Sequence, residues 1–213
     1  MSHDQATEQT LKEHRDHHLM TAQRLSEGLG TPGLKVIEVT THLKGLPSGD
    51  FTGVSGRGDY EAGHIPGAYY LDLQQDLSDA GSDFRFTVPS VAQFEAVMRH
   101  AGIAESDTVV VYAANHPMWA CRAWWLFKVF GHERVLVLDG GLPGWQAQGF
   151  ALSTDQGSVP ASAYQARFHP EMVTDGAALS AQLSDPSLCL LNALSTQQFD
   201  GIGPHYGRPG HIQ

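Results

Sequence analysis

Three short runs of this sequence are apolar at almost every position: LKVIEV at 34–39, DTVVVY at 107–112 and RVLVLD at 134–139. A strand that is apolar on both sides is typical of a parallel sheet covered by helices on both faces. Between the runs lie helix-like segments, among them 90–102 and the Trp-rich 119–130. This alternation predicts an α/β fold with a doubly wound parallel sheet.

The rest of the chain divides around this pattern. Residues 1–18 are predicted to form a polar N-terminal arm, followed by a helix in 21–30. A loop of about two dozen residues is expected after the strand at 34–39, and GAYYLDL at 67–73 is expected to form a further strand. Residues 153–170 lack a strong period and contain two prolines, which indicates a linker.

The charge of the chain limits its partners. The 13 Lys and Arg are outnumbered by 23 Asp and Glu, a formal net charge of -10 that argues against nucleic acid or an anionic membrane as a general partner. The apolar run at 119–130 is too short to cross a bilayer. The polar N-terminus does not resemble a signal peptide, and two cysteines do not make a disulfide framework. We therefore expect a cytoplasmic protein, with its oligomeric state open.

The sequence also repeats itself. Gly63, His64 and Ile65 recur as the triplet at 210–212. Upstream of the triplet, matching residues are separated by 154 positions: Leu25, Leu29, Pro32, Leu34, Ile37 and Glu38 correspond to Leu179, Leu183, Pro186, Leu188, Leu191 and Asn192. Convergence of two α/β units is the alternative to duplication. We expect one complete domain followed by the truncated start of a second.

The motifs RGDYEAGHIPGAYYLD and VVVYAANHPMWACRAWWLFKVFGHERVLVLDGGLPGW resemble the tandem rhodanese family, the thiosulfate and 3-mercaptopyruvate sulfurtransferases. The resemblance covers about 19–213 and implies a five-stranded parallel sheet flanked by helices. It implies a non-catalytic rhodanese-like domain at 19–152, a linker at 153–170 and the start of a second domain at 171–213.

In that family the nucleophile is a cysteine directly after the third long strand of the second domain, which carries sulfur from donor to acceptor as a persulfide. The first domain here has Ala113 at the equivalent position. The resemblance thus implies a degenerate active-site loop formed by Ala113, Ala114, Asn115, His116, Pro117 and Met118. It implies no catalytic residue, metal or cofactor within the chain, and a catalytic cysteine beyond residue 213.

The resemblance also concerns the anionic sulfur donor. Asn192 and Leu194 stand where many family members carry Asp and Arg. Arg208 is the candidate to bind the donor instead, and an ordinary solvated loop arginine is the alternative.

Several other residues have a structural and a functional interpretation, and the structural one is favoured for each. Cys121 and Cys189 are expected to be packed, and His64 and His211 to hydrogen-bond their loops. The histidines His14, His17 and His18 are assigned to a solvated arm rather than a metal site. Coincidence explains Arg-Gly-Asp at 57–59, a strand-to-helix turn explains Asp-Gly-Gly at 139–141, and packing explains Trp119, Trp124, Trp125 and Trp145.

Two functions from other classes compete with sulfur transfer. The first is a non-catalytic rhodanese-like module for binding or regulation. The second is a phosphatase, because some phosphatases share the rhodanese fold. That chemistry needs an arginine six residues after its cysteine, and Phe127 stands there relative to Cys121. The phosphatase is set aside.

Overall fold

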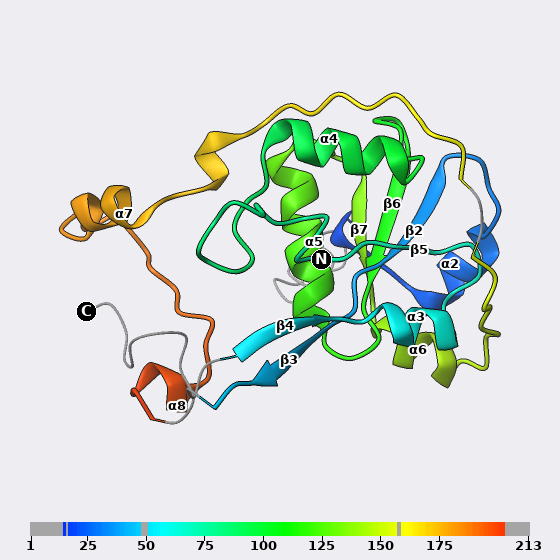
Figure 1. Cartoon of the computed structure of the whole chain (residues 1–213), viewed down its shortest axis with the longest axis horizontal. Coiled ribbons are helices and arrows are strands. Elements are labelled where there is room, and N and C mark those ends of the chain that lie inside the picture. The colour runs from blue at the N-terminus through cyan, green and yellow to red at the C-terminus, as the bar shows by residue number, and fades with distance from the viewer. Residues whose placement is uncertain (1–14, 16, 48–50, 157–158, 203–213) are drawn as a thin grey trace, which may run out of the picture. The chain divides into compact units, whose positions relative to one another are not determined.

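The computed structural model describes residue 15 and residues 17–47, 51–156 and 159–202 (Figure 1). Its main sheet has five strands in the order β1-β7-β6-β2-β5, and every pair is parallel. The strands are β1 (Leu19–Met20), β2 (Leu34–Glu38), β5 (Tyr69–Tyr70), β6 (Thr108–Tyr112) and β7 (Val135–Leu138). The predicted five-stranded parallel sheet is confirmed, with β6 at its centre.

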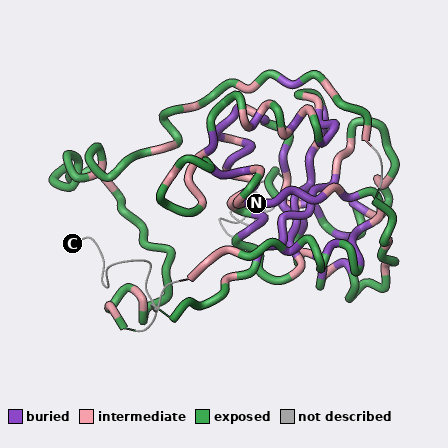
Figure 2. The backbone as a smooth tube through the Cα atoms, viewed as in Figure 1, coloured by how far each residue is buried: buried purple, intermediate pink, exposed green. Residues whose placement is uncertain are grey.

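Helices cover both faces of this sheet, as predicted (Figure 1). One face carries α2 (Ala22–Gly28), α3 (Arg57–Ala62) and α6 (Gly141–Ala147), and the other carries α4 (Val91–His100) and α5 (Pro117–Val129). Side chains alternate between the two faces along β6. Val110 and Tyr112 pack in one buried cluster with Leu25 and Trp145. Four of the five residues of β6 are buried, and buried residues are purple in Figure 2. The sheet is therefore the buried middle layer between the helices.

The expected long loop after β2 contains regular structure that the sequence did not indicate. It holds β3 (Thr41–Gly45), β4 (Phe51–Ser55) and α3, and β3 pairs with β4 in a separate two-stranded sheet. Both strands are short and largely exposed or half-buried, so they lack the apolar run that marks a core strand. The Arg-Gly-Asp triplet lies in the first turn of α3.

The predicted linker lies against helices of the main unit. By contacts, the described residues of Met1–His42 and Ser55–His169 form one compact unit, and those of Leu43–Val54 and Pro170–Gln213 form another. Residues 159–169, hereafter the strap, bond to the helix ends: Ser162 N–H donates to Arg99 O at 3.1 Å, and His169 N–H to Val129 O at 2.8 Å. Tyr164 is only 4% exposed. The first unit thus continues past residue 152, while the limits of a second domain stay a prediction.

The second unit differs from the sequence expectation at Cys189. Its described helices are the 3-10 turn η1 (Pro170–Met172), α7 (Gly176–Gln182) and α8 (Thr196–Phe199). Within the described part of this unit, residues 188–194 form no strand, Cys189 is exposed, and Leu191 is 84% exposed. The prediction that Cys189 is buried is wrong, because an apolar segment without paired strands beside it has nothing to pack against.

Candidate functional site

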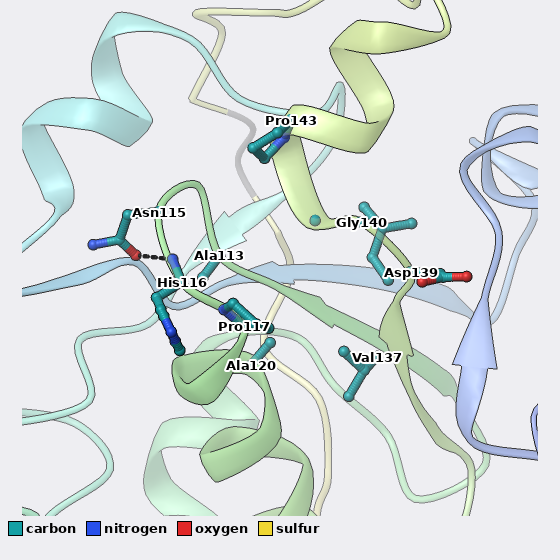
Figure 3. Close-up of a pocket in the computed structure, with 11 residues that line it drawn as sticks. Ala113, Asn115, His116, Pro117, Ala120, Val137, Asp139, Gly140 and Pro143 are labelled. Atoms are coloured by element: carbon teal, nitrogen blue, oxygen red, sulfur yellow. Dashed lines mark hydrogen bonds between the residues drawn. The ribbon is translucent and has the colours of Figure 1, made fainter. Parts of the chain in front are cut away.

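The predicted loop Ala113–Met118 follows the carboxyl end of β6 and runs into the first turn of α5 (Figure 3). Ala113 is 5% exposed, whereas Asn115 through Met118 are exposed. Ligands of open parallel sheets bind at this edge, outside the carboxyl ends of the strands. The structure therefore places the predicted loop at the edge of the sheet where ligands of this fold class bind, with Ala113 directly after the central strand.

The first N–H groups of the loop are bonded to side chains of the protein. The Ala114 N–H donates to Thr40 Oγ1 at 2.9 Å, and the His116 N–H donates to Asn115 Oδ1 at 2.7 Å. A row of unsatisfied N–H groups is what forms an anion-binding nest. Two of those donors are already occupied here.

The backbone N–H groups in the first turn of α5 are also hydrogen-bonded within the protein. The His116 ring caps it by accepting the Met118 N–H on Nδ1 at 3.1 Å, and the Trp119 N–H donates to His116 O at 3.4 Å. Pro117 is the first residue of α5 and has no N–H to offer. The helix start therefore presents few free donors to a ligand.

The first turn of α6 closes the other side of the site. The Leu142 N–H donates to Ala113 O at 3.3 Å, and Pro143 again lacks an N–H. Gly141 has φ +54°, and a Cβ on it would stand 2.7 Å from Ala113 O. The two turns touch backbone to backbone, so glycine is required at this position.

A cavity of about 270 Å³ lies between the two turns (Figure 3). Its lining is formed by Ala113, Asn115, His116, Pro117, Ala120, Val137, Leu138, Asp139, Gly140, Gly141 and Pro143. Asp139 is the one charged side chain in that lining, and its carboxylate accepts a hydrogen bond from Arg15 at 3.0 Å. The cavity is thus mainly apolar with a carboxylate at its edge.

A buried polar network supports the loop from below. Glu38 is fully buried, and its carboxylate accepts hydrogen bonds from Thr40 Oγ1 at 2.8 Å and Tyr112 Oη at 2.5 Å. The Tyr112 hydroxyl in turn accepts the Ile65 N–H at 3.1 Å. Burial raises the pKa of Glu38 above its ordinary value and raises the pKa of Tyr112 as well. The network fixes Thr40 in the position that bonds Ala114.

A histidine and a carboxylate also meet at the rim of the loop. His42 Nε2 lies 2.5 Å from Asp59 Oδ2, and the Asn115 amide lies 3.4 Å from His42 Nδ1. The same amide donates to Thr41 O at 2.8 Å. Both ring nitrogens of His42 have partners, so this pair anchors the loop and offers no free base.

The other candidate residues have structural positions or lie outside the description. His64 has hydrogen-bond partners in the backbone, in agreement with the predicted structural role: it is buried, with Nδ1 2.7 Å from Tyr60 O and Nε2 3.2 Å from Asp155 O. Cys121 is exposed on the outer side of α5, so the prediction that it is packed is wrong; its neighbours Ala120 and Ala123 face the sheet instead. Arg208 and His211 lie outside the described residues.

The N-terminal histidines and the tryptophans lie outside the site, and they differ in burial. His17 and His18 are exposed, His14 lies outside the described residues, and no described group of three His, Cys, Asp or Glu could hold a metal ion. Trp119 and Trp145 are buried, in agreement with a packing role, and Trp124 donates to Val135 O at 3.1 Å. The tryptophans therefore contribute to packing rather than to the site.

Arg122, in the motif that follows the loop, holds a neighbouring loop in place. Its guanidinium donates to Phe86 O and lies over the Trp125 ring at 5.9 Å. Burial lowers the pKa of Arg122 to about 10. This arginine is a structural residue of α5.

Sequence reasoning missed Thr40 and Asp139 as site residues. Asp139 directly follows β7, and Thr40 lies two residues after β2. Their positions just after predicted strands could have identified them, because the carboxyl ends of neighbouring parallel strands meet at one edge of the sheet.

These features define an α/β domain with a site in the loop after its central parallel strand. Residues 21–148 match the family described as rhodanese-like domain, and the chain belongs to the rhodanese family. It is 35% identical over 199 residues to a probable 3-mercaptopyruvate sulfurtransferase of Pseudomonas aeruginosa, covering 91% of this chain and 68% of the relative.

Two further relatives agree. A thiosulfate/3-mercaptopyruvate sulfurtransferase of Arabidopsis thaliana is 32% identical over 212 residues, covering 88% of this chain and 60% of the relative. The crystal structure of SseA from Escherichia coli, described with the rhodanese fold of 3-mercaptopyruvate sulfotransferases, superposes with a TM-score of 0.70 at 29% identity, covering 77% of this chain and 60% of that one. The chain therefore spans about two thirds of the length of such relatives.

None of the described helices has both the length and the apolar character needed to traverse a bilayer.

Proposed function

We propose that the chain is the part of a 3-mercaptopyruvate or thiosulfate sulfurtransferase that carries its non-catalytic rhodanese-like domain. In this proposal a cysteine thiolate beyond residue 213, in the domain that begins near 171, attacks the outer sulfur of thiosulfate or the thiol sulfur of 3-mercaptopyruvate. A new S–S bond forms on the cysteine as the donor's S–S or C–S bond breaks, and sulfite or the enolate of pyruvate leaves with the bonding electrons. A thiophilic acceptor then removes the sulfur and restores the thiolate. The 213 residues alone are expected to be inactive.

The observation that carries this proposal is the Ala113 loop. A persulfide-forming site needs a thiol, and it needs free N–H donors that stabilise the thiolate. Ala113 has no thiol, and the N–H groups of Ala114, His116 and Met118 are bonded within the protein. The names of the relatives supply the substrate class, thiosulfate and 3-mercaptopyruvate.

The test is sulfur transfer by the 213-residue chain itself. It is incubated with cyanide and either thiosulfate or 3-mercaptopyruvate, thiocyanate is measured, and mass spectrometry looks for a bound sulfur atom. We expect thiocyanate at the protein-free rate and no added sulfur. The matched control is the double variant Cys121→Ser/Cys189→Ser, expected to behave identically. Thiocyanate above the protein-free rate would contradict the proposal, and its loss in the double variant would locate the nucleophile.

A non-catalytic module for binding or regulation is the second candidate. It is favoured by the cavity of about 270 Å³ that stays open beside the degenerate loop. Binding of the anionic donor by Arg208 stays a prediction from the sequence, since Arg208 lies outside the described residues. A cytoplasmic location also stays a prediction from the sequence.

A further inference from the structure

The cavity beside the degenerate loop lies between the starts of two helices. Pro117 and Ala120 line it from α5, and Gly141 and Pro143 line it from α6. Such a place ordinarily selects an anion, because the positive end of a helix resides in its unsatisfied N–H groups.

Five of the six residues in the first three positions of these helices have no N–H or an occupied one. Pro117 and Pro143 present ring carbons to the cavity where other residues would present N–H groups. The Met118 N–H is bonded to the His116 ring at 3.1 Å, and the Leu142 N–H to Ala113 O at 3.3 Å. With these donors withdrawn, the two helix starts have few N–H groups left for an anion.

The charge of the cavity has the opposite sign from an anion site. Asp139 is the only charged residue in its lining, and the side chain is 45% exposed. Arg15 already places a guanidinium nitrogen 3.0 Å from Asp139 Oδ2, which shows that this carboxylate accepts a cation. Because Arg15 is itself 66% exposed, the ion pair is weak, and a ligand that also contacts the cavity can displace it.

We propose that this cavity is a binding site for a small organic cation, an amidinium or ammonium group on a compact apolar body, and that it rejects anions. The apolar body would contact Ala113, Ala120 and Val137, and the cationic group would bind Asp139. The proposal concerns the first domain only and does not depend on sulfur transfer elsewhere.

The test uses three probes of one shape and different charge: benzamidinium, benzamide and benzoate. Each is titrated into the full 213-residue chain while backbone amide shifts are followed by NMR. We expect saturable shifts at Asn115, Gly140 and Gly141 with benzamidinium, about fivefold weaker binding of benzamide, and no binding of benzoate.

Three variants separate the cavity from general charge. Asp139→Asn should reduce the affinity for benzamidinium to that for benzamide. Asp83→Asn, which removes an exposed carboxylate from the loop before α4, should leave it unchanged. Arg15→Ala should tighten benzamidinium binding by no more than about fivefold, because it removes a competitor.

A fourth variant tests the location without changing charge. Ala120→Leu fills the cavity and should abolish the shifts from every probe; should it fail to fold, Asp139→Asn at the exposed rim still decides the matter. Benzoate binding as tightly as benzamidinium would overturn the proposal. So would the absence of saturable shifts with any probe, or an equal loss in Asp139→Asn and Asp83→Asn.

Discussion

The Ala114 N–H donates to the Thr40 hydroxyl at 2.9 Å, across 74 residues of sequence. The Thr40 hydroxyl in turn donates its proton to the buried carboxylate of Glu38, with 2.8 Å between Thr40 Oγ1 and Glu38 Oε1. A backbone donor that an anion would use in a rhodanese-type loop is thereby tied to the core. The state of this loop is set by the strand beside it as much as by its own residues.

Thr40→Val tests this connection. Valine has the shape of threonine without the hydroxyl, so the Ala114 N–H loses its acceptor and Glu38 loses a donor. We expect a loss of about 1–3 kcal/mol in the free energy of unfolding, measured with urea. Thr108→Val, on a half-buried strand position outside this network, should change it by less than about 0.5 kcal/mol. Equal effects of the two substitutions would contradict the prediction.

Glu38→Gln should change how stability depends on pH. Burial raises the pKa of Glu38 above 4.5, so the folded state holds its proton more tightly than the unfolded state does. This contribution to stability is complete below pH 4.5 and is lost as the pH rises through the higher folded pKa. The stability of the wild type relative to Glu38→Gln should therefore fall with rising pH.

The measurement is a set of urea-unfolding midpoints from about pH 4 to about pH 8. Glu61→Gln, at an exposed position of α3, provides the control and should follow the wild type in parallel. A difference between wild type and Glu38→Gln that is constant, or that grows with pH, would refute the assignment.

Ala113→Cys should not create a sulfurtransferase. The new thiol would be buried, and the donors around it are occupied, so nothing lowers its pKa. In a Cys121→Ser/Cys189→Ser background, alkylation by iodoacetamide should rise with a midpoint at or above about pH 8.5, with no thiocyanate formed. A midpoint below about pH 7 would mean that the loop still stabilises an anion.

Chymotrypsin should cut the two poorly structured stretches at different rates. Residues 183–194 include Leu191, which is 84% exposed, whereas the strap holds Tyr164 at 4% exposure. Mass spectrometry should find cleavage within 183–194 well before any within 159–169. The same digest in urea, with the chain unfolded, should remove the difference. Cleavage in the strap at an equal rate under native conditions would show that it is not docked.

The strands of the sheet were predictable where they are apolar on both sides. The runs at 34–39, 107–112 and 134–139 contain β2, β6 and β7, because a short run that is apolar at nearly every position is typical of a buried parallel strand. β3 and β4 escaped prediction, since each buries few side chains and its pairing depends on the other.

The site was predictable in part for a similar reason. Ala113 could be placed because it directly follows the predicted strand β6. The bond from Ala114 to Thr40 could not, because it depends on the register in which β2 pairs with β6. Contacts set by strand register are not local, so no sequence window contains them.

The strap has a practical consequence for anyone who makes fragments of this protein. The family match stops at residue 148, yet Glu95 and Glu105 accept the N–H groups of Ala166 at 3.0 Å and Gln165 at 2.6 Å. A recombinant fragment ended at the family boundary would expose the surface that Tyr164 covers. A fragment that ends at His169 keeps the strap together with the buried interior of the first unit.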